Sequence, residues 1–261
     1  MPFFRFLCFL AILALTAGCA ATEENPEAAL LRQARAAFVS GEFLHSEELY
    51  QNYLETYPEG ADRLEAWNRL FDISRNILQD NDKAAKIVEA SMIDASVNPE
   101  NLPGLYEKAA ELYVLMKDYA RAVVLFDDYL RFPGISPEKA HWARLSKARA
   151  LAQAERGLEA LETFGQCARL APGPDPAAEC LGEQAALLVR QKRTGEARSI
   201  YGQIVSNEGV SAARKALAGF SLAEMLEAEG KKKEALALYE SILETYPNQK
   251  AVQTRMDLLR K

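Results

Sequence analysis

The stretch Leu-Glu-Thr-Tyr-Pro occurs at residues 54–58 and again at residues 243–247, so the two copies lie 189 residues apart. The same separation relates Gly41 to Gly230, which precede the two copies. Eight residues before each copy lies a small residue, and small residues recur from the first of these to the last at steps of 38, 38, 38, 37 and 38 residues. The members of this small-residue series are Ser46, Ala84, Ala122, Ala160, Ala197 and Ala235. A constant period of this length indicates an array of stacked structural repeats that forms one elongated unit.

The composition is that of a globular protein with a mildly acidic surface. Of the 261 residues, 49% are hydrophobic and 26% are charged, and the formal net charge is −6. This charge argues against nucleic-acid binding, which requires a basic surface. The sequence contains no nucleophile elbow, phosphate-binding loop or metal-ligating helix motif. We therefore predict a protein that holds a partner and is not an enzyme, with no cofactor and no evident small-molecule substrate.

Helical spacing of apolar residues runs through the whole array, and no segment shows the period of two that marks a strand. Each period contains a first helix, a short turn and a second helix, and several periods close on a proline, which cannot continue a helix. The expected helix pairs are 28–39 with 43–56, 64–79 with 82–95, 106–117 with 119–131, 139–155 with 158–170, 177–192 with 194–206, and 221–229 with 233–245. A final amphipathic helix over 249–260 is expected to cap the array, as the end of a solenoid requires.

The positions of small and bulky residues resemble those of tetratricopeptide repeats. Twelve residues before each member of the small-residue series another alanine recurs, with Asp72 as the exception, and four residues after each member comes a bulky side chain such as Tyr50 or Tyr239. In such hairpins small residues let two helices approach, and a bulky one fills the gap to the next hairpin. The resemblance implies an all-α fold, an α-solenoid of about six helical hairpins with a C-terminal capping helix, over residues 28–261.

Two features depart from the family pattern. The period is 38 residues, whereas the family standard is 34 residues. The second period also places Asp72 and Arg75 at positions expected in the core. We expect this second repeat either to pack irregularly or to bind a partner.

The N-terminus has the pattern of an export signal. Arg5 precedes an apolar run over residues 6–17, which is shorter than the roughly 20 residues that a membrane-spanning helix needs. The run ends in small residues, as a secretory signal does. We therefore expect residues 1–18 to be a signal peptide.

The residues around the expected cleavage site, Leu15-Thr16-Ala17-Gly18-Cys19, resemble a bacterial lipobox. That resemblance implies cleavage before Cys19, attachment of lipid to Cys19, and a short tether over residues 19–27. Ala20 after the cysteine implies an outer-membrane lipoprotein that faces the periplasm. The alternative is an ordinary cleaved signal followed by an incidental cysteine.

Cys167 and Cys180 flank the helix-breaking run over residues 171–176. Each lies about one helical turn from that connection, so a disulfide is geometrically allowed and would contribute roughly 3 kcal/mol. The alternative is a pair of small buried residues at a helix contact. His45 and His141 are distant in the sequence and complete no recognisable ligand cluster, so no metal site is predicted.

In tetratricopeptide proteins the first helix of each hairpin lines a concave surface, and the resemblance implies such a groove here. The candidate groove residues are Phe38, Arg69, Asn76, Glu107, Glu111, Trp142, Arg149, Arg190 and Phe220. They combine large apolar side chains with both signs of charge, which suits an extended or helical peptide. The alternative is an ordinary amphipathic wall, in which Trp142 belongs to the core.

The turns inside the later hairpins carry basic side chains that define a candidate basic edge. Its members are Arg190, Lys192, Arg193, Lys231, Lys232 and Lys233. A cation after a helix C-terminus interacts favourably with the helix dipole by roughly 0.3–1 kcal/mol, which explains these residues without a partner. The other hypothesis is a surface for an acidic partner or an anionic cell-wall polymer.

The layout is similar to that of the tetratricopeptide lipoprotein of the β-barrel assembly machinery, of type IV pilus pilotins and of lipoprotein adaptors of cell-wall synthases. This similarity implies a lipid-anchored protein–protein adaptor at the outer membrane. Its expected partners are an envelope protein or peptide in the groove and the membrane through the lipid. The alternative function is peptidoglycan or glycan binding, or a cell-wall-acting enzyme, which would need a pocket lined by converging acids or a histidine.

Overall fold

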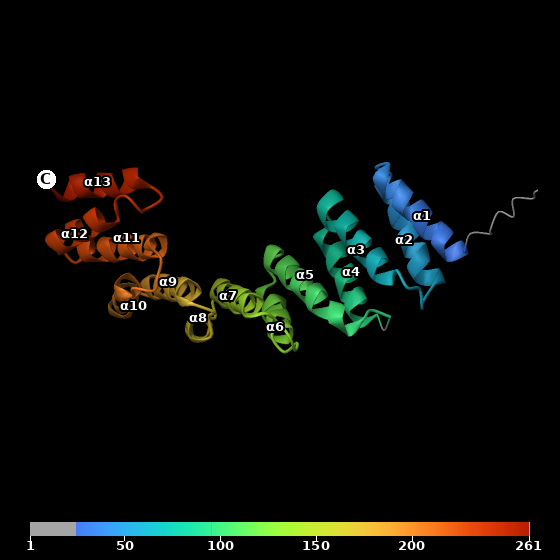
Figure 1. Ribbon diagram of the computed structural model, residues 1–261, viewed down its shortest axis with the longest axis horizontal. Helices are drawn as coiled ribbons and strands as arrows, with labels where there is room; N and C mark the ends of the chain where they lie inside the picture. The colour runs from blue at the N-terminus through green and yellow to red at the C-terminus, as the bar shows by residue number, and fades with distance from the viewer. Residues whose placement is uncertain (1–24, 95, 261) are drawn as a thin grey trace, which may run out of the picture. The chain divides into compact units, whose positions relative to one another are not determined.

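A computed structural model describes residues 25–94 and 96–260, and within these residues the regular structure is helical throughout (Figure 1). The chain divides into two compact units, Met1–Ala66 and Trp67–Lys261, which are described separately. The predicted signal peptide and Cys19 lie outside the described residues. No helix in the described part of the chain is long and apolar enough to cross a membrane.

The first unit holds one helical hairpin, α1 (Pro26–Val39) and α2 (Phe43–Thr56), and the beginning of α3 (Arg63–Asp72). Asn25 caps α1 by accepting a hydrogen bond from the backbone N–H of Glu27. Tyr53 is fully buried in α2. Its hydroxyl donates to the Glu27 carboxylate at 2.7 Å and accepts from the backbone N–H of Asp62 at 3.2 Å. The Tyr53 hydroxyl therefore links the start of α1 to the segment that leads into α3 through two hydrogen bonds.

The buried hydroxyl of Tyr53 leads us to predict that the protein loses stability at alkaline pH. Burial, followed by the hydrogen bond to Glu27, raises the pKa of Tyr53 from 10.0 to about 12. The tyrosine thus ionises in the unfolded chain before it ionises in the folded one, so its contribution is complete below pH 10 and is lost as the pH rises towards 12. We expect the difference in free energy of unfolding between the parent protein and Tyr53→Phe to fall between about pH 8 and about pH 11. Urea denaturation at both pH values measures this, and a difference that does not change with pH would contradict it.

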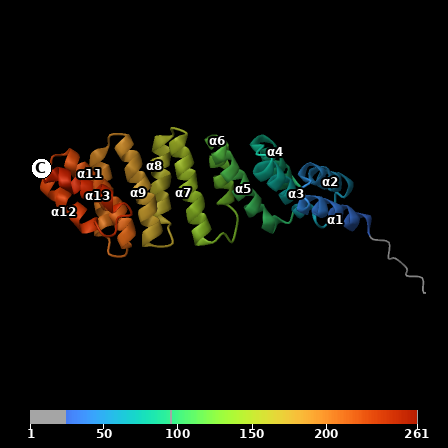
Figure 2. The same ribbon diagram turned by 90° about the horizontal axis from the view of Figure 1, so that it is seen from above.

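The second unit continues α3 and carries the remaining helices. These are the π-helical turn η1 (Ile73–Ile77), α4 (Asn81–Ile93), the 3-10 turn η2 (Pro99–Asn101), α5 (Leu102–Leu115), α6 (Tyr119–Tyr129), α7 (Pro137–Gln153), α8 (Gly157–Arg169), α9 (Pro174–Arg190), α10 (Thr194–Ser206), α11 (Ala212–Ala228), α12 (Lys232–Ile242) and α13 (Gln249–Leu259). Consecutive helices pack as hairpins, and the hairpins follow one another in chain order (Figures 1 and 2). Val252 and Met256 of α13 join the core formed by α11 and α12. The α-solenoid with a capping helix is the fold that the sequence predicts.

A residue with left-handed backbone conformation ends the first helix of each hairpin. These residues are Gly41, Gln79, Lys117, Glu155, Lys192 and Gly230, with φ of 82, 56, 61, 60, 62 and 76°. Each lies five residues before a member of the small-residue series. The next backbone N–H reaches back to the helix, as that of Lys231 does to the Leu226 carbonyl at 2.9 Å, which is the Schellman arrangement. The sequence period is therefore the period of this turn.

Only the outer repeats place glycine, which adopts this conformation without steric cost, in the turn. We expect Lys192→Gly to raise the free energy of unfolding by about 0.5–1 kcal/mol, because the strain of a side chain at positive φ outweighs the added freedom of the unfolded chain. Gly230→Ala is the matched reverse change and should cost about 1 kcal/mol. Urea unfolding followed by circular dichroism measures both, and a Lys192→Gly protein less stable than its parent would oppose the argument.

The buried residues of the core recur with the period of the sequence repeat. All six members of the small-residue series are fully buried. The bulky residues four positions later are also buried, and they are Tyr50, Val88, Phe126, Phe164, Tyr201 and Tyr239. The one polar member, Ser46, donates its hydroxyl hydrogen to the Ala34 carbonyl at 2.9 Å. Small residues thus sit where the two helices of a hairpin approach, and the bulky residues fill the space beside them.

The second repeat is irregular at the point where the sequence departs from the family pattern. The predicted helix over 64–79 is α3 followed by the π-helical turn η1. A π-helical turn contains an extra residue and changes the register of the side chains that follow. Asp72 and Arg75 are only half-buried, and the Arg75 guanidinium lies 5.9 Å from the centre of the Phe71 ring. Two polar residues at positions that the family pattern assigns to the core thus escape full burial, and the second repeat packs irregularly, which is one of the two outcomes expected from the sequence.

The first helix of the last hairpin is longer than predicted. The sequence predicts a start at Ser221, but α11 begins at Ala212, where the Ser211 side chain accepts a hydrogen bond from the backbone N–H of Arg214. A Cβ atom on Gly219 would lie 3.0 Å from Cγ2 of Ile242. Glycine at this position serves close packing of α11 on α12 and does not mark a turn. Similarly, α5 begins at Leu102 and not at residue 106.

Candidate functional site

Three hollows follow one another along the first helices of the second unit. They lie against α5 and α7, against α7, α9 and α11, and against α9 and α11. We call them the proximal, middle and distal hollows. The proximal and middle hollows share Arg149, and the middle and distal hollows share Ala186, Tyr201 and Ser221. Because each hollow shares lining residues with the next, the three hollows are adjacent and form a row along these helices, which we call the hollow row.

The proximal hollow has an aromatic wall and a volume of about 460 Å³. Trp142 packs edge-on against Phe126, with ring centres 5.5 Å apart, and against Tyr129 at 5.8 Å. Charged side chains surround this wall: Glu111 from α5, Arg75 from η1 and Arg149 from α7. An apolar surface with charges at its border suits an amphipathic segment of a partner.

Charged side chains from three helices meet in the middle hollow, which has a volume of about 220 Å³. Arg149 of α7 donates to Glu183 of α9 at 2.6 and 3.0 Å, and to Glu179 of α9 at 3.2 Å. Arg214 of α11 donates to the second oxygen of Glu179 at 3.2 Å. These four residues link three successive first helices across the hollow row. Since their side chains are partly exposed, these ion pairs contribute little to stability and remain open to exchange with a partner's charges.

The distal hollow has a volume of about 540 Å³, and its walls come from α9, α10 and α11. Val189 and Met225 supply apolar surface. Glu224 and Glu229 supply negative charge, and each is already paired, Glu224 with Arg255 at 2.8 Å and Glu229 with Arg198 at 2.7 Å. Methionine adapts its shape to different apolar partners, which suits a surface that binds a peptide.

Small residues at helical spacing make room for the hollow row. On α9 the wall is formed by Ala178, Gly182 and Ala186, which lie four residues apart and therefore share one face of the helix. A Cβ atom added to Gly182 would meet nothing within 4 Å. The spacing of these three small residues is visible in the sequence and could have indicated this wall. The groove prediction relies on large and charged side chains and therefore omits them.

The structure brings together some of the predicted groove residues and separates others. Glu111, Trp142 and Arg149 line the proximal hollow together. Glu107 pairs with Lys139 at 2.6 Å and lines a different hollow, near the connection between α6 and α7. Phe220 packs in the last hairpin, with its ring centre 4.5 Å from that of Tyr246.

The remaining groove candidates line none of these hollows in the described residues. Arg69 is half-buried on α3, and Asn76 is exposed in η1. Arg190 is exposed at the end of α9. Phe38 belongs to the first unit, where it packs edge-on against Phe43 at 5.5 Å. The hollow row is therefore shorter than the predicted groove and belongs to the second unit.

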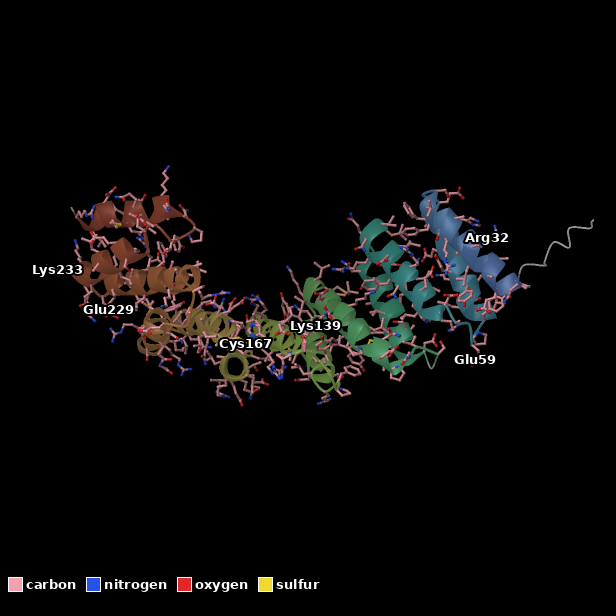
Figure 3. The ribbon with its side chains drawn as sticks, in the orientation of Figure 1. Arg32, Glu59, Lys139, Cys167, Glu229 and Lys233 are labelled. Atoms are coloured by element: carbon pink, nitrogen blue, oxygen red, sulfur yellow. A yellow bond between two sulfur atoms is a disulfide. The ribbon has the colours of Figure 1, made fainter. Side chains whose placement is uncertain are left out.

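The candidate basic edge falls on the turns that lead into α10 and α12. Arg193 pairs with Glu196 at 2.6 Å, and Lys231 pairs with Glu229 at 2.7 Å. Lys233 lies at the same end of the second unit as Glu229 (Figure 3). Arg190, Lys192, Lys232 and Lys233 are exposed and have no ion pair with any described residue. The edge thus mixes cations that are already neutralised with cations that face solvent.

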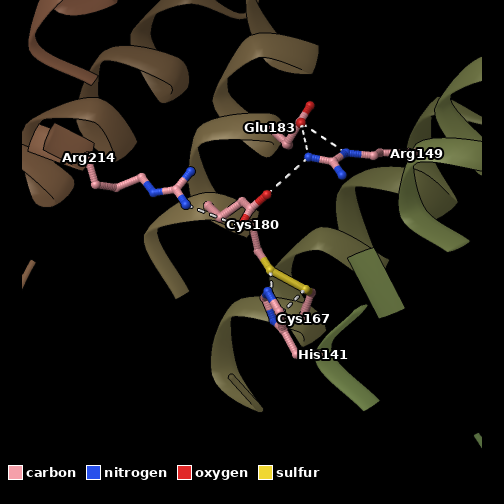
Figure 4. Close-up of a disulfide and its surroundings, with 7 residues drawn as sticks. His141, Arg149, Cys167, Cys180, Glu183 and Arg214 are labelled. Atoms are coloured by element: carbon pink, nitrogen blue, oxygen red, sulfur yellow. Dashed lines mark hydrogen bonds and ion pairs between the residues drawn. A yellow bond between two sulfur atoms is a disulfide. The ribbon is translucent and has the colours of Figure 1, made fainter. Parts of the chain in front are cut away.

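A disulfide joins Cys167 of α8 to Cys180 of α9, with the Cα atoms 5.9 Å apart (Figure 4). His141 of α7 lies beside it, with Nδ1 3.6 Å from Sγ of Cys167 and 3.8 Å from Sγ of Cys180. Burial lowers the pKa of His141, and the negative charge of Glu179 opposes that shift. The sequence analysis predicts no metal site because the histidines are distant from the cysteines in sequence. For His141 this reason is wrong, since His141 and Cys167 are 26 residues apart in sequence but neighbours in space.

The comparisons with known proteins support the repeat fold. The model of the tetratricopeptide repeat family matches residues 217–248, which cover most of α11, all of α12 and the loop after α12. No curated protein matches the chain in sequence.

Solved structures are similar to the chain at low sequence identity. BtubC (BKLC) from P. vanneervenii is 17% identical, with a TM-score of 0.54 over 88% of this chain and 92% of that chain. YrrB, described as a TPR protein with an unusual peptide-binding site, is 16% identical, with a TM-score of 0.50 over 78% of this chain and 96% of that chain. PilF of Pseudomonas aeruginosa is 16% identical, with a TM-score of 0.47 over 90% of this chain and 96% of that chain. These likenesses show the fold alone.

Proposed function

We propose that the chain is a protein–protein adaptor, and that its hollow row binds an extended segment of a partner protein. The observation that carries the proposal is the succession of three adjacent hollows along α5, α7, α9 and α11, each of which shares lining residues with the next. A row of adjacent hollows suits a ligand that is long and narrow, such as a peptide, better than it suits a compact small molecule. That YrrB is described as having a peptide-binding site is in keeping with this proposal.

The chemistry of the row supports a peptide with mixed side chains. An aromatic residue (Trp142) and a guanidinium group (Arg149) are the side chains that most often dominate binding energy at protein interfaces. Arg149 and Glu179 already bind each other, so a partner's charged groups would exchange with existing ion pairs and leave no buried charge unpaired. We therefore expect a ligand that places apolar side chains in the proximal and distal hollows and polar groups over the middle one.

The proposed cellular setting is the bacterial envelope. The lipobox-like sequence before Cys19 is the basis for this part of the proposal, which includes an N-terminal lipid, the outer membrane and a body in the periplasm. The process would be the assembly of an envelope complex, with β-barrel assembly, pilus assembly and control of cell-wall synthesis as its variants. Labelling of cells with a clickable fatty acid, comparing the parent protein with Cys19→Ser, tests the anchor. Equal labelling of the two proteins would contradict lipid attachment at Cys19.

Affinity capture with a blocked hollow tests the adaptor function. Ser146 lines the proximal hollow, so Ser146→Trp should fill part of it. The matched control is Leu158→Trp, because Leu158 is 78% exposed on the second helix α8 and lines none of the three hollows. We expect an envelope protein captured by the parent and by Leu158→Trp to be lost with Ser146→Trp.

The same experiment separates the adaptor from the alternative function. Capture of cell-wall polymer without protein would favour glycan binding and contradict the adaptor. Glu179 and Glu183 do converge in the middle hollow, but both bind Arg149. Both carboxylates are thus engaged in salt bridges, and neither is left free to contact a substrate. The middle hollow therefore offers little support for a cell-wall-acting enzyme.

A further inference from the structure

Three donor atoms from three helices converge beside the disulfide. His141 lies on α7, Cys167 on α8 and Cys180 on α9 (Figure 4). The imidazole Nδ1 and the two sulfur atoms all lie within 4.8 Å of one another. Two cysteines need no histidine to form a disulfide, so the disulfide alone does not account for the position of the imidazole against both sulfurs.

We propose that, when the disulfide is reduced, His141, Cys167 and Cys180 bind one thiophilic divalent cation, of which Zn²⁺ is the representative. In tetrahedral protein sites zinc lies about 2.3 Å from a thiolate and about 2.0–2.1 Å from an imidazole nitrogen, which places neighbouring sulfur and nitrogen ligands about 3.6 Å apart. The nitrogen–sulfur distances of 3.6 and 3.8 Å match this spacing. Once the bond between them is broken, the two sulfurs can separate to the roughly 3.8 Å that the same geometry requires.

The surroundings suit such a complex. Both sulfurs are buried, with Cys167 1% and Cys180 0% exposed, whereas His141 is half-buried. Two thiolates neutralise a divalent cation, so the complex adds no net charge to the buried site. Glu179 is engaged by Arg149 and Arg214 and is not free as a fourth ligand. The fourth position is therefore left to water or to a small ligand, as in zinc sites with three protein ligands.

The metal complex and the disulfide are mutually exclusive states of the same atoms. On loading, two thiols and one Zn²⁺ give the dithiolate complex and release two protons. A thiol reductant such as glutathione opens the disulfide before loading by supplying two electrons and two protons, and is itself oxidised to its disulfide. Oxidised glutathione converts the loaded site back to the protein disulfide: the two bound thiolates lose two electrons and form the S–S bond, and the cation leaves. The S–S bond of the oxidant accepts those two electrons with two protons and becomes two thiols. The site thus exchanges a cation for a covalent link between α8 and α9.

Titration of the reduced chain with Co²⁺ under inert gas tests the proposal, because cobalt–thiolate complexes are coloured. We expect the absorption to saturate at one Co²⁺ per chain, Zn²⁺ to displace the cobalt, and the oxidised protein to show no such bands. His141→Ala should weaken binding by at least about tenfold, since even supporting residues of metal sites have effects of that size. Cys167→Ser, which keeps every other thiol, should abolish the bands.

His45→Ala is the matched control, because it removes the other histidine, which is exposed on α2, and it should bind as the parent does. Circular dichroism shows whether each variant is folded. As a second measurement, Zn²⁺ should raise the melting temperature of the reduced parent but not of the oxidised parent. Failure of the reduced parent to bind one equivalent would overturn the proposal, as would equal affinities of the parent and a folded His141→Ala.

Discussion

Phe164→Ala is expected to lower the free energy of unfolding by about 3–5 kcal/mol, the cost of removing a fully buried aromatic side chain. Phe164 is 1% exposed and occupies the bulky position of the fourth repeat, four residues after Ala160. Its ring fills the space that the small residues leave between helices. The substitution would leave a cavity there, and a hairpin of two helices has no further packed side chains that could move in to fill it. Because each repeat is stabilised mainly by its neighbours, the loss should extend to the adjacent repeats.

Leu158→Ala is the control for this change. Leu158 lies on the same helix but is 78% exposed, so its truncation should change stability by no more than about 0.5 kcal/mol. Urea denaturation followed by circular dichroism compares the two variants with the parent. Similar losses for Phe164→Ala and Leu158→Ala would contradict the assignment of the bulky position to the core.

Removal of the disulfide is the second change with a large expected effect. Cys167 and Cys180 are 13 residues apart in sequence, and closing a loop of this length stabilises the folded state by about 3 kcal/mol through the entropy of the unfolded chain. We expect the double variant Cys167→Ala/Cys180→Ala to lose about that amount. The parent should lose a similar amount when it is reduced in the presence of a chelator, which keeps metal from replacing the disulfide.

The double variant supplies its own control, since a reductant should leave its stability unchanged. Thermal or urea unfolding with and without reductant measures both effects. A parent protein whose stability does not respond to reduction would show that the link between α8 and α9 contributes nothing. A double variant that still responds would place the effect at another cysteine.

The fold could be predicted from the sequence because the repeat obeys a local rule. The small-residue series and the bulky positions four residues later give every hairpin the same packing. The left-handed turn residues occur with the same period, but only at Gly41 and Gly230 does the residue type indicate a left-handed turn. At Lys117 and Lys192 the turn follows from the surrounding helices, so propensity gives no sign of it.

Parts of the candidate site could not be predicted, for reasons that differ from residue to residue. Trp142 and Arg149 were predicted because large and charged side chains are conspicuous, whereas Gly182 shapes a hollow by having no side chain. The approach of His141 to Cys167 depends on how α7 packs against α8, and sequence spacing carries no information on that distance. The start of α11 at Ala212, before the predicted start at Ser221, depends on the close packing of Gly219 against α12, which the sequence does not show.

Site-specific photo-cross-linking tests the central claim, that one extended partner segment occupies the hollow row. A photo-reactive amino acid is placed at Ser146 in the proximal hollow, at Ser221 between the middle and distal hollows, and at Leu158 on α8 as a control. The account predicts that cross-links from Ser146 and Ser221 map to one continuous stretch of the same partner, and that Leu158 gives no cross-link. Cross-links from Leu158 to that partner, or cross-links from the two serines to unrelated proteins, would contradict it.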